Sequence, residues 1–309
     1  MAQEKTDIVD SFLSPCRKYY FIINSHGCAP DRIMNKKNIL LKCLLASLCC
    51  IWAFLPWGDS YAAPNKDTDL RGRAEDLYEK RDDPQNAQKA IESYRKIVSE
   101  NPQDEKAACR LAQLLVWDGA LSSDEKAIAC YKEAASLSEK VLKQNPKSTG
   151  GLYWLGVSYG LWASTAGPIK SISLVGEVKS VMERLAELDP SYEGGGAYRV
   201  LGRLYNKLPF FLGGDDAKAE ELLRKAVSMG PRYWLNHLYL ADLLQKCGRE
   251  KEARQLVTQV RDTKAAEPGL EPETRLWKDL AGKYLRGEAD PDDSLADTSC
   301  TATKPGDGQ

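Results

Sequence analysis

Apolar residues recur along the chain at the spacing of an amphipathic helix, and prolines interrupt this pattern at nearly regular intervals. Apolar positions at i, i+3, i+4 and i+7 form one helix face, and a helix usually ends before the residue that precedes a proline. Four such stretches end at dipeptides that lie 44, 44 and 41 residues apart: Asn101-Pro102, Asn145-Pro146, Asp189-Pro190 and Gly230-Pro231. The pattern therefore predicts four helices that end at these prolines.

A second kind of helix lies between the prolines, with a large apolar residue followed by Gly or Ala. The pairs are Leu111-Ala112, Leu155-Gly156, Leu201-Gly202 and Leu240-Ala241. The small residue allows a neighbouring helix to approach closely. Two alternating helix types with a terminating proline are typical of tetratricopeptide repeats (TPRs), whose usual period is 34 residues. We therefore predict an all-α fold, a TPR-like right-handed superhelix (an α-solenoid of antiparallel helix pairs with extended repeats). An irregular helical bundle is the alternative.

The extra length of each repeat has to lie somewhere in the chain. We expect residues 122–135 to lengthen one helix, and residues 166–175 and 208–216 to enlarge inter-helix loops. A half-repeat near residues 70–97 should open the array. A final pair over 234–261 should nearly close it, with a capping helix at 275–285.

The N-terminal segment has the features of an export signal. Lys36 and Lys37 precede an apolar run, whose uninterrupted part, 43–55, has the length of a signal-peptide core and is short for a membrane span. Small residues at Ser60 and Ala62 predict cleavage after Ala62 and export to the periplasm. An uncleaved N-terminal anchor is the alternative. A lipid anchor stays open, although Cys49 follows Leu48 and Cys50 follows Cys49, whereas a lipidated cysteine needs a small residue directly before it.

These features divide the chain into four parts. Met34 lies just before the basic residues and is interpreted as the true start of translation. Residues 1–33 are therefore interpreted as a disordered segment upstream of that start, and residues 34–62 as the signal peptide. Residues 63–286 are predicted to form the TPR-like domain. Residues 287–309 are acidic, then small and polar, which predicts a disordered tail.

Composition and motifs argue against catalysis and against nucleic acid as a partner. The formal net charge is -1, and the chain has two histidines. No metal-binding or nucleophile motif occurs, so we predict neither an enzyme nor a cofactor. His237 is interpreted as a core or interface residue. Cys109 and Cys130 would lie at opposite ends of a helical hairpin, roughly 10 Å or more apart, whereas a disulfide requires Cα atoms within about 7 Å. Both are interpreted as small buried apolar residues.

The repeat register predicts which side chains line the concave groove. The residues that we expect there are Gln113, Trp117, Tyr153, Val157, Leu161, Arg199, Arg203 and Asn206, with Cys109, Val116, Leu238, Asp242 and Gln245 at equivalent positions. This lining is apolar over two repeats and cationic over a third, which suits an amphiphile with a carboxylate or an acidic segment of a partner.

Two arginines of this lining could act together. Arg199 and Arg203 lie four residues apart, so both guanidinium groups could reach one carboxylate. Alternatively, they pair with Glu193, Glu220 or solvent. The glycines at 194–196 could hold an anion at a helix start, but close packing or a turn with positive φ explains them more simply.

One stretch resembles a known family more closely than the repeat pattern alone. Residues 188–205 read LDPSYEGGGAYRVLGRLY, followed by KLP at 207–209 and GGD at 213–215, and an earlier segment at 154–163 reads WLGVSYGLWA. These segments resemble the TRAP transporter T-component family over roughly residues 70–262. Departures are Ala197, where the family tends to have proline, and the apolar 210–212, where it has a glycine-rich turn.

The resemblance implies a periplasmic accessory or binding protein of a TRAP-type solute uptake system. Its partner would be the periplasmic solute-binding (P) component, and it would hold an organic-acid or hydrophobic ligand. The alternative is a general cell-envelope TPR scaffold that binds no solute. Solute handling predicts an enclosed apolar channel near Trp117, Tyr153 and Leu161, whereas a scaffold predicts an open polar groove. A homo-oligomer stays open.

Overall fold

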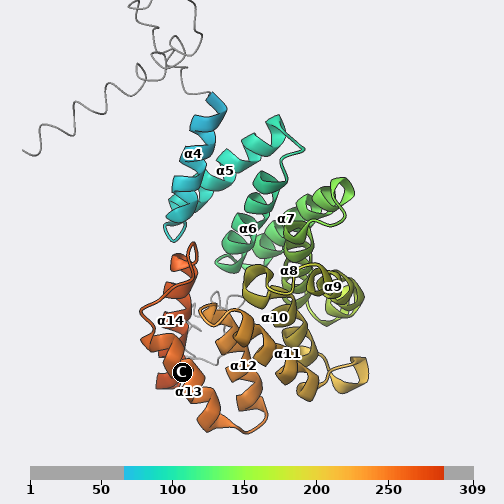
Figure 1. Cartoon of the computed structure of the whole chain (residues 1–309), viewed down its shortest axis with the longest axis vertical. Helices are drawn as coiled ribbons and strands as arrows, with labels where there is room; N and C mark the ends of the chain where they lie inside the picture. The colour runs from blue at the N-terminus through green and yellow to red at the C-terminus, as the bar shows by residue number, and fades with distance from the viewer. Residues whose placement is uncertain (1–65, 289–309) are drawn as a thin grey trace, which may run out of the picture. The chain divides into compact units, whose positions relative to one another are not determined.

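The computed structural model describes residues 66–288, which belong to one compact unit and contain eleven α-helices and a short 3₁₀ helix, η1 (Figure 1). Consecutive helices pair as hairpins that stack in chain order, which confirms the all-α helix-pair prediction. The pairs are α4 (Lys66–Glu79) with α5 (Pro84–Glu100), α6 (Glu105–Ala120) with α7 (Asp124–Gln144), α8 (Thr149–Thr165) with α9 (Pro168–Leu188), α10 (Tyr192–Lys207) with α11 (Asp216–Met229), and α12 (Trp234–Lys246) with α13 (Glu250–Asp262). They are followed by α14 (Glu271–Arg286), and η1 (Phe210–Leu212) lies between α10 and α11.

The predicted helix ends are confirmed at all four prolines. Helices α5, α7, α9 and α11 each end one residue before a C-cap residue whose N–H donates to the carbonyl four residues back. These caps are Asn101, Asn145, Asp189 and Gly230. The proline after each cap cannot continue the helix, which is why this local signal places the end so closely.

Small residues of the second helix type lie where two helices approach closely, as predicted. A Cβ atom on Gly156 would lie 2.2 Å from Cε of Met182 in α9, and one on Gly202 would lie 2.7 Å from Cγ of Leu223 in α11. Such distances are well inside van der Waals contact, so a side chain at either position would push the paired helix away.

Two expected features differ in the structure. Residues 168–175 are helical, because Pro168 begins α9 after a turn at Gly167 (φ 92°), and proline is favourable in a first helical turn. The extra residues therefore lengthen a helix instead of a loop. Residues 70–97 belong to a complete helix pair, not to a half-repeat. The expected long helix over 122–135, the loop over 208–216 and the final helix near 275–285 are confirmed.

Buried apolar side chains form two clusters along the solenoid. The first contains residues of α4 to α10 and ends at Leu201, and the second runs from Tyr205 to Tyr284 and includes Trp277. No buried residue in the described part of the chain belongs to both clusters, although the partly buried Leu222 packs against both. The two cores therefore meet at α10 and α11.

The solenoid curves until its last helix reaches its first hairpin. Figure 1 shows α14 next to the turn between α4 and α5, and Arg81 in that turn bonds to Glu273 in α14 across 192 positions of sequence. The described helices thus close into a ring. Among residues 66–288, no helix is long and apolar enough to span a membrane. The predicted start, signal peptide and most of the predicted tail lie outside the described residues.

Candidate functional site

Two adjoining cavities open on the inner side of the ring. The Tyr233 cavity, about 640 Å³, lies between the end of α4, the start of α10, the α11–α12 turn and residues 267–270. The Trp154 cavity, about 590 Å³, lies between α4, α6, Trp154 of α8 and Tyr192 at the start of α10. Both cavities share four lining residues: Glu75, Arg110, Gln113 and Glu193.

Arg110 is held between the two cavities by hydrogen bonds. Its Nη2 donates to Glu75 Oε1 over 2.7 Å, and its Nη1 donates to Gln113 Oε1 over 2.8 Å. The other carboxylate oxygen of Glu75 accepts a hydrogen bond from the hydroxyl of Tyr94. Burial and this carboxylate raise the pKa of Tyr94, so the hydroxyl stays protonated and remains a donor.

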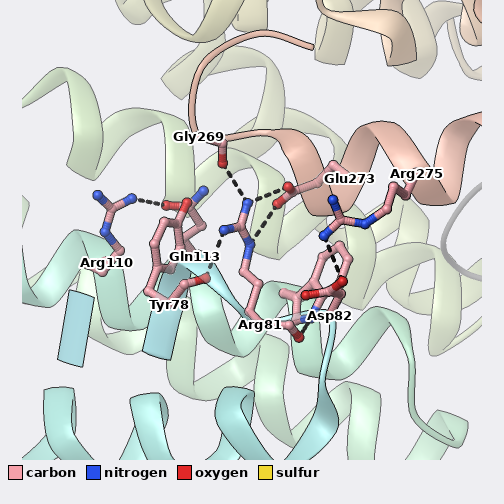
Figure 2. A network of polar contacts seen from close by, with 9 residues as sticks. Tyr78, Arg81, Asp82, Arg110, Gln113, Gly269, Glu273 and Arg275 are labelled. Carbon is pink, nitrogen blue, oxygen red and sulfur yellow. Dashed lines mark hydrogen bonds and ion pairs between the residues drawn. The ribbon is translucent and has the colours of Figure 1, made fainter. Parts of the chain in front are cut away.

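The ring of Tyr78 lies between two guanidinium groups, as Figure 2 shows. The Cζ atoms of Arg81 and Arg110 are 4.0 and 3.9 Å from its centroid, which is the geometry of cation–π contacts. Burial raises the pKa of Tyr78 to about 12, although the two arginines oppose that shift. This stack connects the charged centre of the cavities to the place where the ring closes.

Arg81 closes the ring through a buried ion pair. Its side chain is 1% exposed, and it donates two bonds to the Glu273 carboxylate, one to Gly269 O (2.7 Å) and one to Tyr78 O (2.9 Å). An exposed ion pair between Asp82 and Arg275 (2.6 Å) lies beside it (Figure 2). Burial raises the pKa of Glu273, and the charge of Arg81 opposes this shift.

Glu193 lines both cavities from a left-handed backbone conformation. It has φ 49°, and within residues 66–288 it is the one residue other than glycine with a positive φ. Its carboxylate accepts no hydrogen bond from any described residue, and burial raises its pKa against the charges of Arg199, Arg110 and Arg81. Strained backbone at a cavity is typical of functional positions.

The adjacent glycines are confirmed as a turn with close packing. Gly194 and Gly195 have φ of 60° and 78°. A Cβ atom on Gly195 would lie 3.0 Å from Cα of Ala226, and one on Gly196 would lie 2.6 Å from the ring of Tyr153. Glycine is needed here for both reasons that the sequence suggested.

The sequence profile of the TRAP transporter T-component matches residues 116–287, which is more than half of the chain. The chain belongs to this family. T-components of this TPR type are not enzymes, in agreement with the prediction from motifs. No curated protein sequence matches this T-component significantly.

A solved structure supports the TPR fold. A thermophilic TPR protein of Thermus thermophilus is 18% identical to this T-component, with a TM-score of 0.52 over 70% of this chain and 98% of the other. A crystal structure of MamA is 17% identical over 69% of this chain and 98% of the other, with a TM-score of 0.39.

The two arginines predicted as a carboxylate clamp do not converge in this T-component. Arg199 is 1% exposed and donates to Glu193 O, Asn236 Oδ1 and Tyr153 Oη at 3.0, 2.9 and 2.5 Å. Its guanidinium also lies 3.9 Å from the ring centroid of Tyr233. Arg203 instead forms an ion pair with Asp242 of α12. Arg199 is therefore a buried structural side chain, directed at protein acceptors.

The other predicted groove residues divide between cavity and core. Gln113 lines both cavities. Trp117 and Tyr153 are buried, and Trp117 donates from Nε1 to Arg81 O over 3.0 Å. Asn206 is buried and donates to Asp242. Val157 and Leu161 are partly buried and lie outside the lining of both cavities.

Sequence reasoning missed most of the residues that line the cavities. Among them are Glu75, Arg110, Glu193, Lys106, Trp154 and Tyr192. The repeat register was defined on the second helix type, so it assigned no groove position on α4. On α6 it assigned Cys109, which lines the Trp154 cavity, but not the adjacent Arg110, which lines both cavities. Charged and aromatic residues next to the register positions are the signal that could have found them.

The histidine and cysteine interpretations agree with the structure. His237 is buried, its Nε2 lies 3.1 Å from Pro231 O, and burial lowers its pKa, so it is a neutral core residue. Cys109 and Cys130 are free thiols whose pKa burial raises to about 12 and about 11. Cys130 is buried and Cys109 partly so, whereas Cys247 is an exposed free thiol.

Proposed function

We propose that this T-component is a periplasmic accessory protein of a TRAP-type uptake system, which pairs with the solute-binding component and holds a solute in the Trp154 cavity. The observation that carries the proposal is this cavity, about 590 Å³, inside the ring of a T-component. A concave site with aromatic walls and a few polar groups is the usual form of a small-molecule site.

The lining of the Trp154 cavity favours an organic acid with an apolar body. Trp154, Tyr192 and Tyr94 supply aromatic surface, and Lys106 is an exposed cation in the same lining. The Lys106 ammonium has no hydrogen-bond or ion-pair partner within the described range, so it is available to a carboxylate. Glu193 lines the cavity as well and would repel a second acid group. We therefore expect a monocarboxylate whose acid group lies at Lys106.

This proposal moves the site away from the one expected from the register. The cavities do not include Trp117, Tyr153 or Leu161, and Arg199 has protein partners, so the solute site is proposed at the neighbouring residues of α4, α6 and α10. Gln113 is retained from the original set, since it lines both cavities.

A pull-down tests the pairing. The full-length chain with a C-terminal tag is expressed in its host and purified under mild conditions, and co-purifying proteins and small molecules are identified by mass spectrometry. Recovery of a periplasmic solute-binding protein supports the proposal. Recovery of outer-membrane or assembly proteins alone contradicts it. The native mass of the purified protein reports whether it is a homo-oligomer.

A matched pair of variants tests the solute site. Lys106→Gln should reduce the amount of a co-purifying carboxylate at least about tenfold, since a charge-assisted hydrogen bond contributes about 1.5–3 kcal/mol. Lys89→Gln, an exposed lysine on α5 that lines neither cavity, is the control. If both variants retain equal amounts of the co-purifying carboxylate, the Trp154 cavity is excluded as the site that binds its acid group.

The scaffold function is favoured by one separate observation. The Tyr233 cavity has a charged lining that includes Glu79, Arg232 and Glu267, which suits a polar peptide better than an apolar solute. If the pull-down yields assembly proteins and no small molecule, this second function should replace the first.

A further inference from the structure

The junction that closes the ring is polar, unlike the apolar packing inside the solenoid. We call it the seam: the contact of the α4–α5 turn with residues 269–275 (Figure 2). Its described contacts are the buried pair of Arg81 and Glu273, the bond to Gly269 O and the exposed pair of Asp82 and Arg275. Water can satisfy each of these groups if the junction separates.

The two sides of the seam belong to different hydrophobic cores. Tyr78 is part of the first cluster, and Leu270 and Trp277 are part of the second. Buried apolar area therefore does not hold the seam closed. A buried ion pair adds little, because the Coulombic attraction is largely offset by the cost of removing both charges from water.

The two cavities relate differently to the seam. The Tyr233 cavity has walls on both sides of it, with Tyr78 and Glu79 on one side and Gly269 and Leu270 on the other. The lining of the Trp154 cavity lies between residues 71 and 193, entirely in the first half. Opening of the seam would divide the Tyr233 cavity and leave the Trp154 cavity intact.

We propose that the seam opens and closes, and that the Tyr233 cavity is complete only in the closed ring. A molecule in that cavity contacts both sides of the seam and so holds the ring closed, because it binds the closed state better than the open one. The device rests on the ring itself and is independent of what the Trp154 cavity holds.

Electron–electron distance measurements between spin labels test this directly. In the full chain with Cys247 and the six cysteines at 16, 28, 43, 49, 50 and 300 replaced by serine, labels at Lys89→Cys and Asp279→Cys report across the seam, since both positions are exposed and outside the network. A control pair at Glu221→Cys and Lys251→Cys reports within the second half. Glu273→Gln should raise the population of longer seam distances about tenfold, the ratio for one lost charge-assisted bond. The control distances should not change.

A second variant keeps the test decisive if Glu273→Gln folds poorly. Arg81→Met with Glu273→Met replaces the ion pair by apolar side chains, which should hold the seam closed and narrow its distance distribution. The proposal is overturned if Glu273→Gln leaves the seam pair as narrow as the control pair. It is equally overturned if the double variant opens as widely as the single one.

Discussion

Replacing Arg199 by methionine removes a buried cation while keeping most of the side-chain volume. In the folded chain this guanidinium donates to Glu193 O, Asn236 Oδ1 and Tyr153 Oη and stacks on Tyr233. Asn236 in turn bonds the carbonyls of Gly194, Ala226 and Gly230, so the arginine fixes the start of α10 against the α11–α12 turn.

The expected cost follows from these contacts. Each buried acceptor that loses its donor costs about 1–3 kcal/mol, and removal of one member of a buried charge cluster costs about 3–5 kcal/mol. We expect Arg199→Met to lower the free energy of unfolding by about 4 kcal/mol, a large part of the 5–15 kcal/mol that is usual for a domain. Arg203→Met should cost about 1 kcal/mol, because Asp242 keeps Asn206 and Lys207 as partners.

Urea unfolding followed by circular dichroism at 222 nm measures the comparison at fixed pH and temperature. The two arginines lie four positions apart on one helix, so Arg203→Met is a matched control for any effect on helix propensity. If Arg199→Met costs no more than Arg203→Met, then Arg199 is not structural, and the carboxylate clamp that the sequence suggested should be reconsidered.

Three further predictions concern pH, packing and thiols. Burial raises the pKa of Glu193 and Glu273, so the folded chain binds these protons more tightly than the unfolded chain. The stability from these groups is therefore present below the ordinary carboxyl pKa and is lost as pH rises through their folded pKa. Glu193→Gln should flatten this decline in unfolding experiments at a series of pH values above the ordinary carboxyl pKa, and an unchanged slope would refute this. Gly156→Ala should lower the stability of the fold by about 1–3 kcal/mol, because the added Cβ would meet Met182. Gly160→Ala, whose Cβ would have nothing within 4 Å, should raise it by up to about 1 kcal/mol. Thermal melts measure both variants, and equal shifts in melting temperature would contradict the packing described for Gly156. A thiol reagent at pH 8 should modify Cys247 quickly, and Cys109 and Cys130 only on unfolding, because burial raises the pKa of the latter two to about 12 and about 11. Rapid modification of either Cys109 or Cys130 in the folded chain would be inconsistent with the structure.

The helix pairs could be predicted from the sequence because their signals are local. A proline and its predecessor act within one turn, so the ends of α5, α7, α9 and α11 follow from the sequence to the residue. The same signal misleads at Pro168, because proline can begin a helix as well as stop one. Small residues at Gly156 and Gly202 are recognisable since close helix packing needs them in a fixed register.

The cavities could not be predicted in the same way, because they form where distant parts of the chain meet. Glu75 of α4 and residues 267–270 reach one cavity through the curvature of the whole solenoid, and no local pattern signals a pair such as Arg81 and Glu273. Arg199 illustrates the other difficulty. A face assigned from helix period does not say whether a neighbouring aromatic ring or carbonyl already occupies the space in front of it.

The closed ring also constrains how this protein can change over evolution. An open solenoid gains or loses a repeat at small cost, since each unit contacts only its neighbours. Here an added helix pair would move α14 away from the first hairpin and leave Arg81 without Glu273. A change in the number of repeats would therefore lose the closed ring, whereas new length within a repeat keeps it, as in the 21-residue helices α7 and α9. Relatives that keep this arginine and glutamate should keep the same count of helix pairs.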